Sequence, residues 1–135
     1  MLVKETHHTV SVRPSDFDVL GHVNNAVVLE FLEMGRAHWL AENNLAVNGC
    51  VVAVVARAVV DYRREIAVPI VEVSTVLESP TADEIVDGDL TFRASFVQTI
   101  RLQGSAEPAV NALITVAFVS SEHRRLASMN EFLAA

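Results

Sequence analysis

The sequence lacks the features that mark several large classes of protein. It contains one cysteine, Cys50, so an intramolecular disulfide is excluded and a thiolate metal cluster is not expected. Its ten lysines and arginines are outnumbered by seventeen acids and form no basic run, which disfavours a nucleic-acid or anionic-membrane partner. No apolar run approaches the ~20 residues that span a bilayer, and the first residues lack the apolar centre of a signal peptide. Together these absences favour a cytoplasmic protein.

Apolar residues, in contrast, are abundant. They make up 51% of the 135 positions, which excludes a disordered chain because such chains have too little apolar surface to bury. The length suits one domain over residues 1–135 and is too short for two. No repeat, linker or low-complexity segment interrupts the chain, so we expect one packed core.

The long apolar segment that follows SDFDVLGHVNN has the periodicity of a helix. Asn24 or Asn25 is a candidate N-cap, because its side-chain oxygen can accept a backbone N–H of the first turn. Glu30 and Glu33 occupy a narrow polar side, and the helix is expected to end near Glu42. Since most of the circumference is apolar, we expect the helix to be enclosed as the axis of the domain. The apolar arc consists of Val27, Val28, Phe31, Leu32, Met34, Gly35, His38 and Trp39.

Five segments have the composition of β-strands. Residues 6–13 alternate weakly, and the stretch VVAVVARAVVDYRRE after Gly49 is too rich in β-branched residues for a helix. VPIVEVSTVLE, DGDLTFRASFVQTI and AVNALITVAFVS follow, separated by short turns. One strand, a helix and four strands predict an α+β fold, in which consecutive strands form an antiparallel sheet packed on the helix. Several strands are apolar on both faces, which favours a homodimer or a larger assembly.

Alternation in the last two of these segments predicts which side chains share a face. One face of the first segment carries Leu90, Phe92, Ala94 and Phe96. One face of the second segment carries Val110, Ala112, Ile114, Val116 and Phe118.

The segment SDFDVLGHVNN, immediately before the helix, concentrates groups suited to acyl transfer to water. A helix N-terminus presents free N–H groups and about half a positive charge, which stabilise a developing oxyanion. Asp18 could attack a carbonyl or activate water, His22 could orient the substrate, and Gly21 would let backbone approach closely. Asp16 is better explained as a loop-forming partner of the helix dipole, and His38 as a core or interface histidine. For Asp18 and His22, the residues alone leave structural and catalytic roles open.

The longer stretch VRPSDFDVLGHVNNAVVLEFLEMGRAHWL resembles the signature of hotdog-fold acyl thioesterases, the hydroxybenzoyl-CoA thioesterase family and its plant-type acyl-ACP relatives. In that family a strand ends in Asp-x-Asp, a turn follows, and an antiparallel sheet wraps around one long helix. The resemblance implies a hotdog fold, with a five-stranded antiparallel sheet around one central helix. It also implies active sites at a dimer interface and a reaction that needs no metal or redox cofactor.

The resemblance also assigns roles to residues. Asp18 stands where the family has its catalytic aspartate, and the backbone N–H of Asn25 stands where the family polarises the thioester carbonyl. GHVNN is similar to the QHVNN of the acyl-ACP branch, so His22 matches that branch's active-site histidine, whereas Leu20 replaces an asparagine of that branch. The other members of this segment are expected to contact the substrate: Gly21, Val23 and Asn24.

A second resemblance concerns DYRRE, which is similar to the EYRRE of the acyl-ACP branch. The first carboxylate of that motif is implicated in catalysis there, so Asp61 is a secondary candidate for the site. Arg57, Arg63 and Arg64 are candidates for contacts with the phosphates of coenzyme A, as charge-assisted donors. A surface pairing of Asp61 with Arg63 accounts for these two residues about equally well.

The function favoured is hydrolysis of an acyl thioester, on coenzyme A or on an acyl carrier protein, to a free carboxylic acid and a thiol. Coenzyme A or phosphopantetheine enters as part of the substrate, and no metal is expected because no histidine pair has convincing metal-ligand spacing. The apolar surfaces between helix and sheet would hold the acyl chain. Two alternatives stay open: a non-catalytic hotdog protein that binds acyl thioesters, and a hotdog dehydratase. The expected assembly is a homodimer or homotetramer.

Overall fold

The computed structural model describes residues 3–45, 49–81, 83–84 and 91–133. Its long helix α1 spans Asn25–Glu42, and shorter helical segments lie at Pro14–Asp16 (η1) and Met129–Leu133 (α3). Within these ranges, no helix combines the length and the apolar character needed to cross a bilayer. The strands are Thr6–Ser11 (β1), Val51–Tyr62 (β2), Ile70–Ser79 (β3), Arg93–Leu102 (β4), Pro108–Ser120 (β5) and Leu126–Ala127 (β6).

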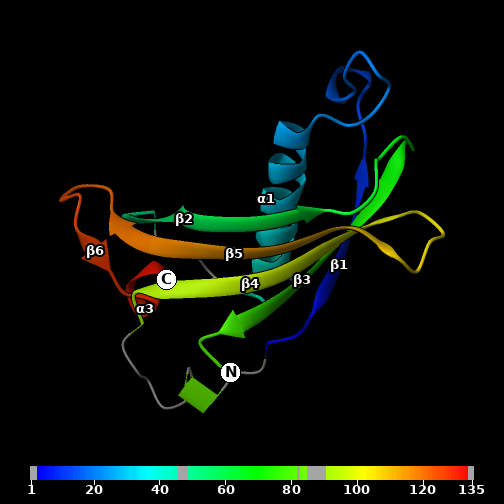
Figure 1. Ribbon diagram of the computed structural model, residues 1–135. Coiled ribbons are helices and arrows are strands. Elements are labelled where there is room, and N and C mark those ends of the chain that lie inside the picture. Colours follow the sequence, from blue (N-terminus) through cyan, green and yellow to red (C-terminus); the bar gives the residue numbers. More distant parts are fainter. Residues whose placement is uncertain (1–2, 46–48, 82, 85–90, 134–135) are drawn as a thin grey trace.

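The strands form one antiparallel sheet in the order β1-β3-β4-β5-β2, and β6 pairs with the end of β5. The predicted hotdog fold, with five long strands and one long helix, is confirmed. The expectation that consecutive strands pair is wrong for β2, which lies against β5 and not against β3. The reason is the connection over residues 63–69, which crosses the sheet to β3, between β1 and β4, and does not reverse beside β2 (Figure 1). β1 and β2 are therefore the two edges.

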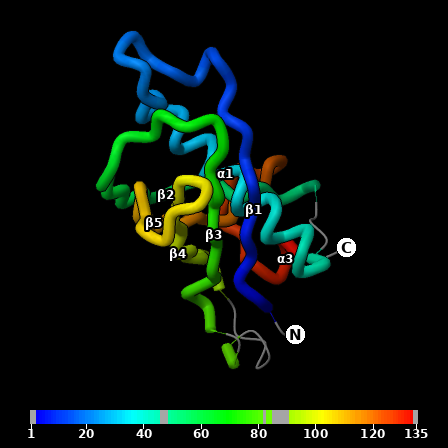
Figure 2. Tube along the Cα trace, turned by 90° about the vertical axis from the view of Figure 1, so that its right-hand side faces the viewer, coloured from blue at the N-terminus to red at the C-terminus, as the bar shows by residue number. Residues whose placement is uncertain are grey.

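Helix α1 lies on one face of this sheet, with β1 beside it (Figures 1 and 2). It begins as predicted, because Asn24 is the N-cap and its side chain accepts the N–H of Ala26 at 2.9 Å. The prediction of an enclosed helix is wrong for the single chain, since Leu29 and Met34 are exposed. The sheet covers only the face that carries Val28, Phe31, Leu32, Gly35 and Trp39.

A very close contact sets the position of α1 on the sheet. A Cβ atom added at Gly35 would lie 2.5 Å from Cγ1 of Val73 and 2.9 Å from Oγ1 of Thr75, so only glycine permits this approach. The fully buried Gln98 bridges the same contact, because its Nε2 donates to the Leu32 carbonyl and to Thr75 Oγ1, each at 2.9 Å. The helix therefore rests on β3 and β4, and an apolar groove stays open between α1 and β2.

The inner faces predicted for β4 and β5 agree with the structure. Ala94 and Phe96 of β4 are buried, whereas Phe92 lies just before the strand and is exposed. Leu90 lies outside the described residues. All five predicted residues of β5 are buried, and α3, which the sequence did not predict, packs Phe132 against Phe118 at a ring distance of 5.0 Å.

Candidate active site

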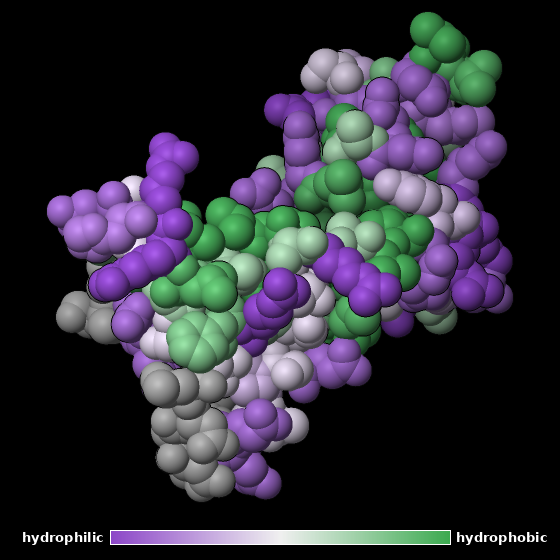
Figure 3. Space-filling view, turned by 60° about the vertical axis from the view of Figure 1, so that its left-hand side comes forward, coloured by the Kyte–Doolittle hydropathy of each residue, from purple (hydrophilic) through white to green (hydrophobic). Residues whose placement is uncertain are grey.

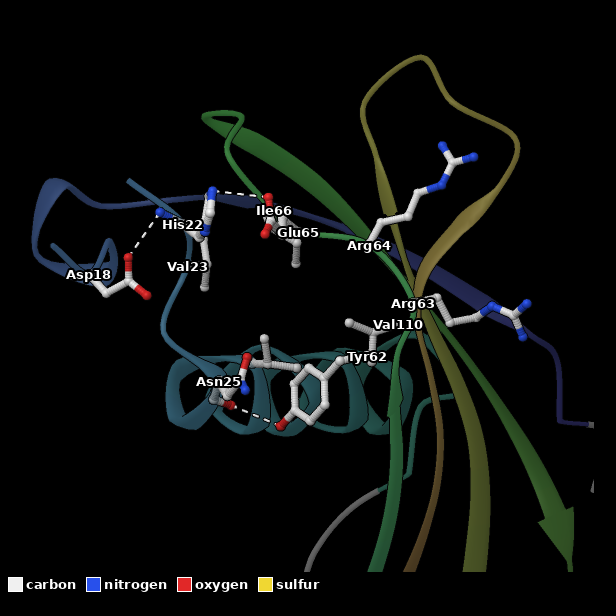
Figure 4. Close-up of a pocket in the computed structure, with 11 residues that line it drawn as sticks. Asp18, His22, Val23, Asn25, Tyr62, Arg63, Arg64, Glu65, Ile66 and Val110 are labelled. Atoms are coloured by element: carbon white, nitrogen blue, oxygen red, sulfur yellow. Dashed lines mark hydrogen bonds and ion pairs between the residues drawn. The ribbon is translucent and has the colours of Figure 1, made fainter. Parts of the chain in front are cut away.

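A pocket opens where the N-terminus of α1, the loop before it and the end of β2 meet (Figure 4). Its volume is about 330 Å³. Asp18, His22 and Asn25 all line it, so the structure brings together the three residues predicted to carry the chemistry. The other lining residues are Val23, Val28, Tyr62, Arg63, Arg64, Glu65, Ile66 and Val110.

Asp16 braces the loop that leads into this pocket. The residue is only 1% exposed, and its carboxylate accepts hydrogen bonds from Arg13 Nη2 at 2.8 Å and from the Arg13 backbone N–H at 2.7 Å. Hydrogen bonds from the Arg13 side chain hold the pKa of Asp16 below its usual value of 3.8, against the opposing effect of burial. The Asp16 carbonyl also accepts the N–H of Asn24 at 2.9 Å. These contacts agree with the loop-forming role expected for Asp16.

Asp18 lies in a tight turn that presents its carboxylate beside the pocket. Its Oδ1 accepts the backbone N–H of Leu20 at 2.9 Å and that of His22 at 3.1 Å. The Asp18 N–H donates to the His22 carbonyl at 2.7 Å, which closes the turn. No residue in the described part of the chain hydrogen-bonds Oδ2. One oxygen is thus anchored while the other can meet a ligand.

Two of the predicted substrate contacts serve the loop. Gly21 has φ +82° and closes the turn with an N–H bond to the Asp18 carbonyl at 3.1 Å. The predicted close approach of backbone at Gly21 is not seen, because no described atom lies within 4 Å of a Cβ placed there. Neither Gly21 nor Asn24 lines the pocket, whereas Val23 does and is held by an N–H bond to the Ile66 carbonyl at 2.8 Å.

The first turn of α1 supplies a backbone donor at the pocket that no described residue occupies. The Asn24 side chain occupies the N–H of Ala26, and the Asn24 carbonyl accepts those of Val27 and Val28. The backbone N–H of Asn25 has no partner among the residues that the structure describes. Because it also lies at the positive end of the helix dipole, it is suited to stabilise an oxyanion.

Two polar residues of the pocket, Tyr62 and Glu65, were not predicted as site residues. His22 Nε2 lies 3.0 Å from a carboxylate oxygen of Glu65, so the side chain of His22 pairs with this residue and not with Asp18 (Figure 4). The Tyr62 hydroxyl donates to the Asn25 carbonyl at 3.1 Å and ties the end of β2 to the helix start. Both belong to the YRRE part of DYRRE, whose resemblance was the signal that could have found them.

Asp61 does not reach the pocket. Tyr62 faces the helix, and successive side chains of a strand point to opposite faces, so Asp61 lies on the other side of the sheet, in a separate hollow. No ion pair joins it to Arg63 within the described residues, so the alternative surface pairing is also not seen. Arg57, on β2, is likewise not part of the pocket.

Arg63 and Arg64 stand at the outer side of the pocket, pointing away from Asp18 (Figure 4). Both backbone N–H groups donate to the carbonyl of Ala109. Arg64 forms an ion pair with Glu107, whereas the Arg63 guanidinium has no carboxylate partner in the described chain. Among the described residues of the pocket, Arg63 is therefore the cation that is free to meet an anionic ligand.

The remaining histidines lie elsewhere. His38 of α1 stacks on His8 of β1 with ring centroids 4.5 Å apart, and burial with the nearby His38 lowers the pKa of His8. His7 contacts Ser74 on the outer face of the sheet. Among the described residues, no cluster of three or more histidine, cysteine or acidic side chains is placed to hold a metal ion.

The geometry combines a carboxylate with a free oxygen, an unpaired N–H at a helix N-terminus, and a histidine paired with a glutamate. Val28 and Val110 form an apolar floor beside them. An acyl carbonyl whose oxygen accepts the Asn25 N–H can therefore lie near both a base and apolar surface.

Known proteins resemble this chain over most of its length. The family model of the thioesterase-like superfamily matches residues 12–135, which include every residue of the pocket. A search of curated proteins finds no match.

Solved structures of low sequence identity share the fold. A DHNA-CoA thioesterase from Staphylococcus aureus superposes with a TM-score of 0.80 at 14% identity, covering 93% of this chain and 81% of that one. A 1,4-dihydroxy-2-naphthoyl-CoA thioesterase from Synechocystis gives 0.76 at 16% identity, covering 93% and 90%. The PA5185 protein from Pseudomonas aeruginosa gives 0.77 at 21% identity, covering 92% and 82%.

Proposed function

The chain belongs to the thioesterase-like superfamily, and from this premise we propose that it hydrolyses acyl-coenzyme A thioesters to a carboxylic acid and free coenzyme A. The observation that carries the proposal is that Asp18 lines the same pocket as Asn25, whose backbone N–H has no partner among the described residues. A protein that only binds acyl thioesters gains nothing from an acid beside the carbonyl.

In the proposed reaction Asp18 acts as a general base through its free Oδ2. It takes a proton from a water molecule, whose oxygen attacks the thioester carbonyl carbon while the carbonyl oxygen becomes negative. The Asn25 N–H and the helix dipole stabilise that oxyanion. When the tetrahedral species collapses, the carbon–sulfur bond breaks and the sulfur receives the proton from Asp18. His22, held by Glu65, orients the substrate.

Coenzyme A is the proposed carrier for two reasons. Arg63 stands at the outer side of the pocket without a carboxylate partner in the described chain, and a guanidinium is a strong ligand for phosphate. Two of the solved structures that share the fold are named for activity on coenzyme A esters. Arg64 is the matched comparison, because Glu107 already neutralises it.

The test is a thioesterase assay that follows thiol release from short, long and aryl acyl-CoAs and from the same acyl groups on an acyl carrier protein. We expect wild type to hydrolyse at least one acyl-CoA faster than its carrier-protein counterpart, and Arg63→Ala to raise KM more than Arg64→Ala. Ligand binding without hydrolysis would contradict the proposal. A single turnover in ¹⁸O-water should label the product acid and leave Asp18 unlabelled; labelled Asp18 would instead identify a nucleophile.

We also propose that the chain works as a homodimer joined at the β2 edge. Val52, Val54 and Val55 of this edge strand are exposed, and Figure 3 shows an apolar band along the side of the molecule on which β2 lies. Such a long apolar edge is a template for pairing with another strand. A two-fold axis that pairs β2 with its copy would extend the sheet across both chains.

The neighbouring face of α1 supports the same contact. The groove of about 470 Å³ between α1 and β2 is lined by Leu29, Glu33, Arg36, Ala37 and Leu40, which follow one stripe of the helix. Two antiparallel copies of this stripe would place Glu33 near Arg36 of the second copy. Light scattering should show that Val55→Lys halves the number of chains per particle, and an unchanged particle mass would contradict the proposal.

A further inference from the structure

Helix α1 and strand β5 pass three hollows in the same order. From the active-site pocket they run past the groove between α1 and β2 to a small cavity of about 60 Å³. The inner face of β5 gives Val110 to the pocket, Ile114 to the groove and Phe118 to the cavity. On α1, Val28 lines the pocket and Trp39 lines the cavity. Four residues line both the groove and the cavity, which therefore adjoin: Arg36, Leu40, Ala53 and Val116.

The walls of this cavity are apolar except at two positions. Helix α3 closes one side with Met129 and Phe132, which are both buried. The polar exceptions are the guanidinium of Arg36 and the indole N–H of Trp39, and no acidic side chain of the described chain lines the cavity. The cavity thus has room for one small group and offers it hydrogen-bond donors.

Both donors have capacity to spare. Trp39 is 0% exposed, and its Nε1 has no hydrogen-bond partner among the described residues. Arg36 Nη1 donates to Gln98 Oε1 at 3.1 Å, and within the described ranges no carboxylate lies at ion-pair distance from Arg36. Burial lowers the pKa of the Arg36 guanidinium, against the opposing effect of Glu33. Buried donors of this kind favour a ligand that brings an acceptor, above all an anionic one.

We propose that the cavity binds a carboxylate at the far end of the acyl group, so that the preferred substrates are ω-carboxyacyl thioesters of coenzyme A. Arg36 binds this carboxylate through charge-assisted hydrogen bonds, and Trp39 Nε1 donates to the same group. The inference rests on the proposed hydrolysis and names the class of its substrate.

The spacing along α1 sets the length of acyl chain required. Arg36 follows Asn25 by about three turns, or roughly 16 Å along the helix axis. The guanidinium is held nearer to Asn25 than its Cα, because its partner Gln98 also binds the Leu32 carbonyl, one turn back. A short acyl group bound at the Asn25 N–H does not cover this distance, whereas a longer chain lying in the groove does. The edge-paired dimer would cover the open side of that groove.

The experiment compares two series of coenzyme A esters of increasing length, one of linear dicarboxylic acids and one of plain fatty acids. We expect kcat/KM to favour the dicarboxylic ester once the chain is long enough to reach Arg36. Arg36→Met should lower kcat/KM for that ester by about 10–100-fold, and for the plain ester of equal length by much less. Trp39→Phe, which removes the indole N–H, should reduce the preference by a smaller factor.

Glu33→Gln is the matched control. Glu33 lines the groove but not the cavity, and in the proposed dimer it lies near Arg36 of the second copy. The control should keep the preference for the dicarboxylic ester. If Glu33→Gln loses the preference together with Arg36→Met, Arg36 serves the contact between copies and the inference is overturned.

Reversal of charge gives a measurement that loss of packing cannot imitate. Arg36→Glu should prefer an ω-aminoacyl-CoA to the dicarboxylic ester, and where it does not fold, Arg36→Met decides. Equal preference in wild type and Arg36→Met would overturn the inference and leave the proposed hydrolysis intact, provided that plain esters are cleaved. If no ester is cleaved, the proposed function fails. Calorimetry with the same two series then tests the cavity alone: tighter binding of the dicarboxylic ester to wild type than to Arg36→Met would support it, and equal binding would overturn it.

Discussion

Asp16 and Asp18 are two aspartates only two positions apart in the chain, and they have opposite environments. Asp16 is buried, and both of its oxygens accept hydrogen bonds from Arg13. Asp18 is exposed, one oxygen is held by two backbone N–H groups, and the other faces no donor in the described chain. Asp16 therefore has a structural role, whereas Asp18 has a carboxylate oxygen available for reaction.

The difference shows that a carboxylate's surroundings, and not its place in a motif, decide what it can do. The bonds that lower the pKa of Asp16 also make it a poor base. Asp18 accepts only weaker backbone donors, and these orient it without using its second oxygen. Substitutions at the two sites should separate activity from stability.

The largest effect is expected for Asp18→Asn. The amide oxygen can still accept the N–H groups of Leu20 and His22, so the turn should keep its shape. Loss of the general base should lower kcat by about 10²–10⁴-fold. Steady-state kinetics on the best acyl-CoA, with a thermal melt of the same sample, check both statements. Wild-type kcat in a folded Asp18→Asn variant would remove Asp18 from the mechanism.

The reverse pattern is expected for Asp16→Ala. The change removes charge-assisted bonds to the Arg13 side chain and leaves the Arg13 backbone N–H without its acceptor. We expect the free energy of unfolding to fall by about 2–3 kcal/mol, which corresponds to a Tm lower by roughly 7–11 °C. Below that temperature kcat should fall far less than in Asp18→Asn. A larger loss of kcat than of stability would place Asp16 in the chemistry.

A smaller effect on kcat and on the free energy of unfolding is expected for Gly21→Ala. Gly21 holds a left-handed φ of +82° in the turn that presents Asp18, and an alanine there should cost about 1–2 kcal/mol. No described atom lies within 4 Å of a Cβ placed at this position, so the cost comes from backbone strain and not from a clash. Chemical denaturation measures it. An unchanged stability would show that the turn adopts another conformation in solution.

The smallest effect concerns acid stability. Because Asp16 has a lower pKa in the folded chain than its ordinary value of 3.8, its contribution to stability is fully present above about pH 4 and is lost as the pH falls through the folded pKa. Melting temperatures between pH 5 and 2 should therefore fall more steeply for wild type than for Asp16→Ala. Parallel curves for the two proteins would contradict the assigned pairing of Asp16.

The sequence predicted the elements that depend on local pattern. An N-cap at Asn24 or Asn25, the end of α1 near Glu42 and the inner face of β5 follow from capping chemistry and periodicity, and the structure has the cap at Asn24. The loop-forming role of Asp16 and the position of Asp18 beside the helix start followed from the acids in SDFDVLGHVNN.

Features that depend on distant contacts were not predictable. β2 is valine-rich on both faces and carries an irregularity between Val55 and Arg57, so alternation alone could not decide that Tyr62 points inward and Asp61 outward. The pairing of His22 with Glu65 requires the crossing connection after β2, which no local pattern reveals. For the same reason, local pattern did not predict that one face of α1 is uncovered in the single chain.

The lack of a side chain at Gly35 affects the position of the whole helix α1 as well as the packing around Gly35. Any larger residue would have to lift the helix by roughly 1 Å to restore ordinary van der Waals separations. Because α1 is a stiff rod, such a shift at its middle would be transmitted to Asn25, about 15 Å away along the axis. In the proposed complex, the hydrogen atom of Gly35 would therefore set how far the Asn25 amide reaches toward the carbonyl, although Gly35 does not line the pocket.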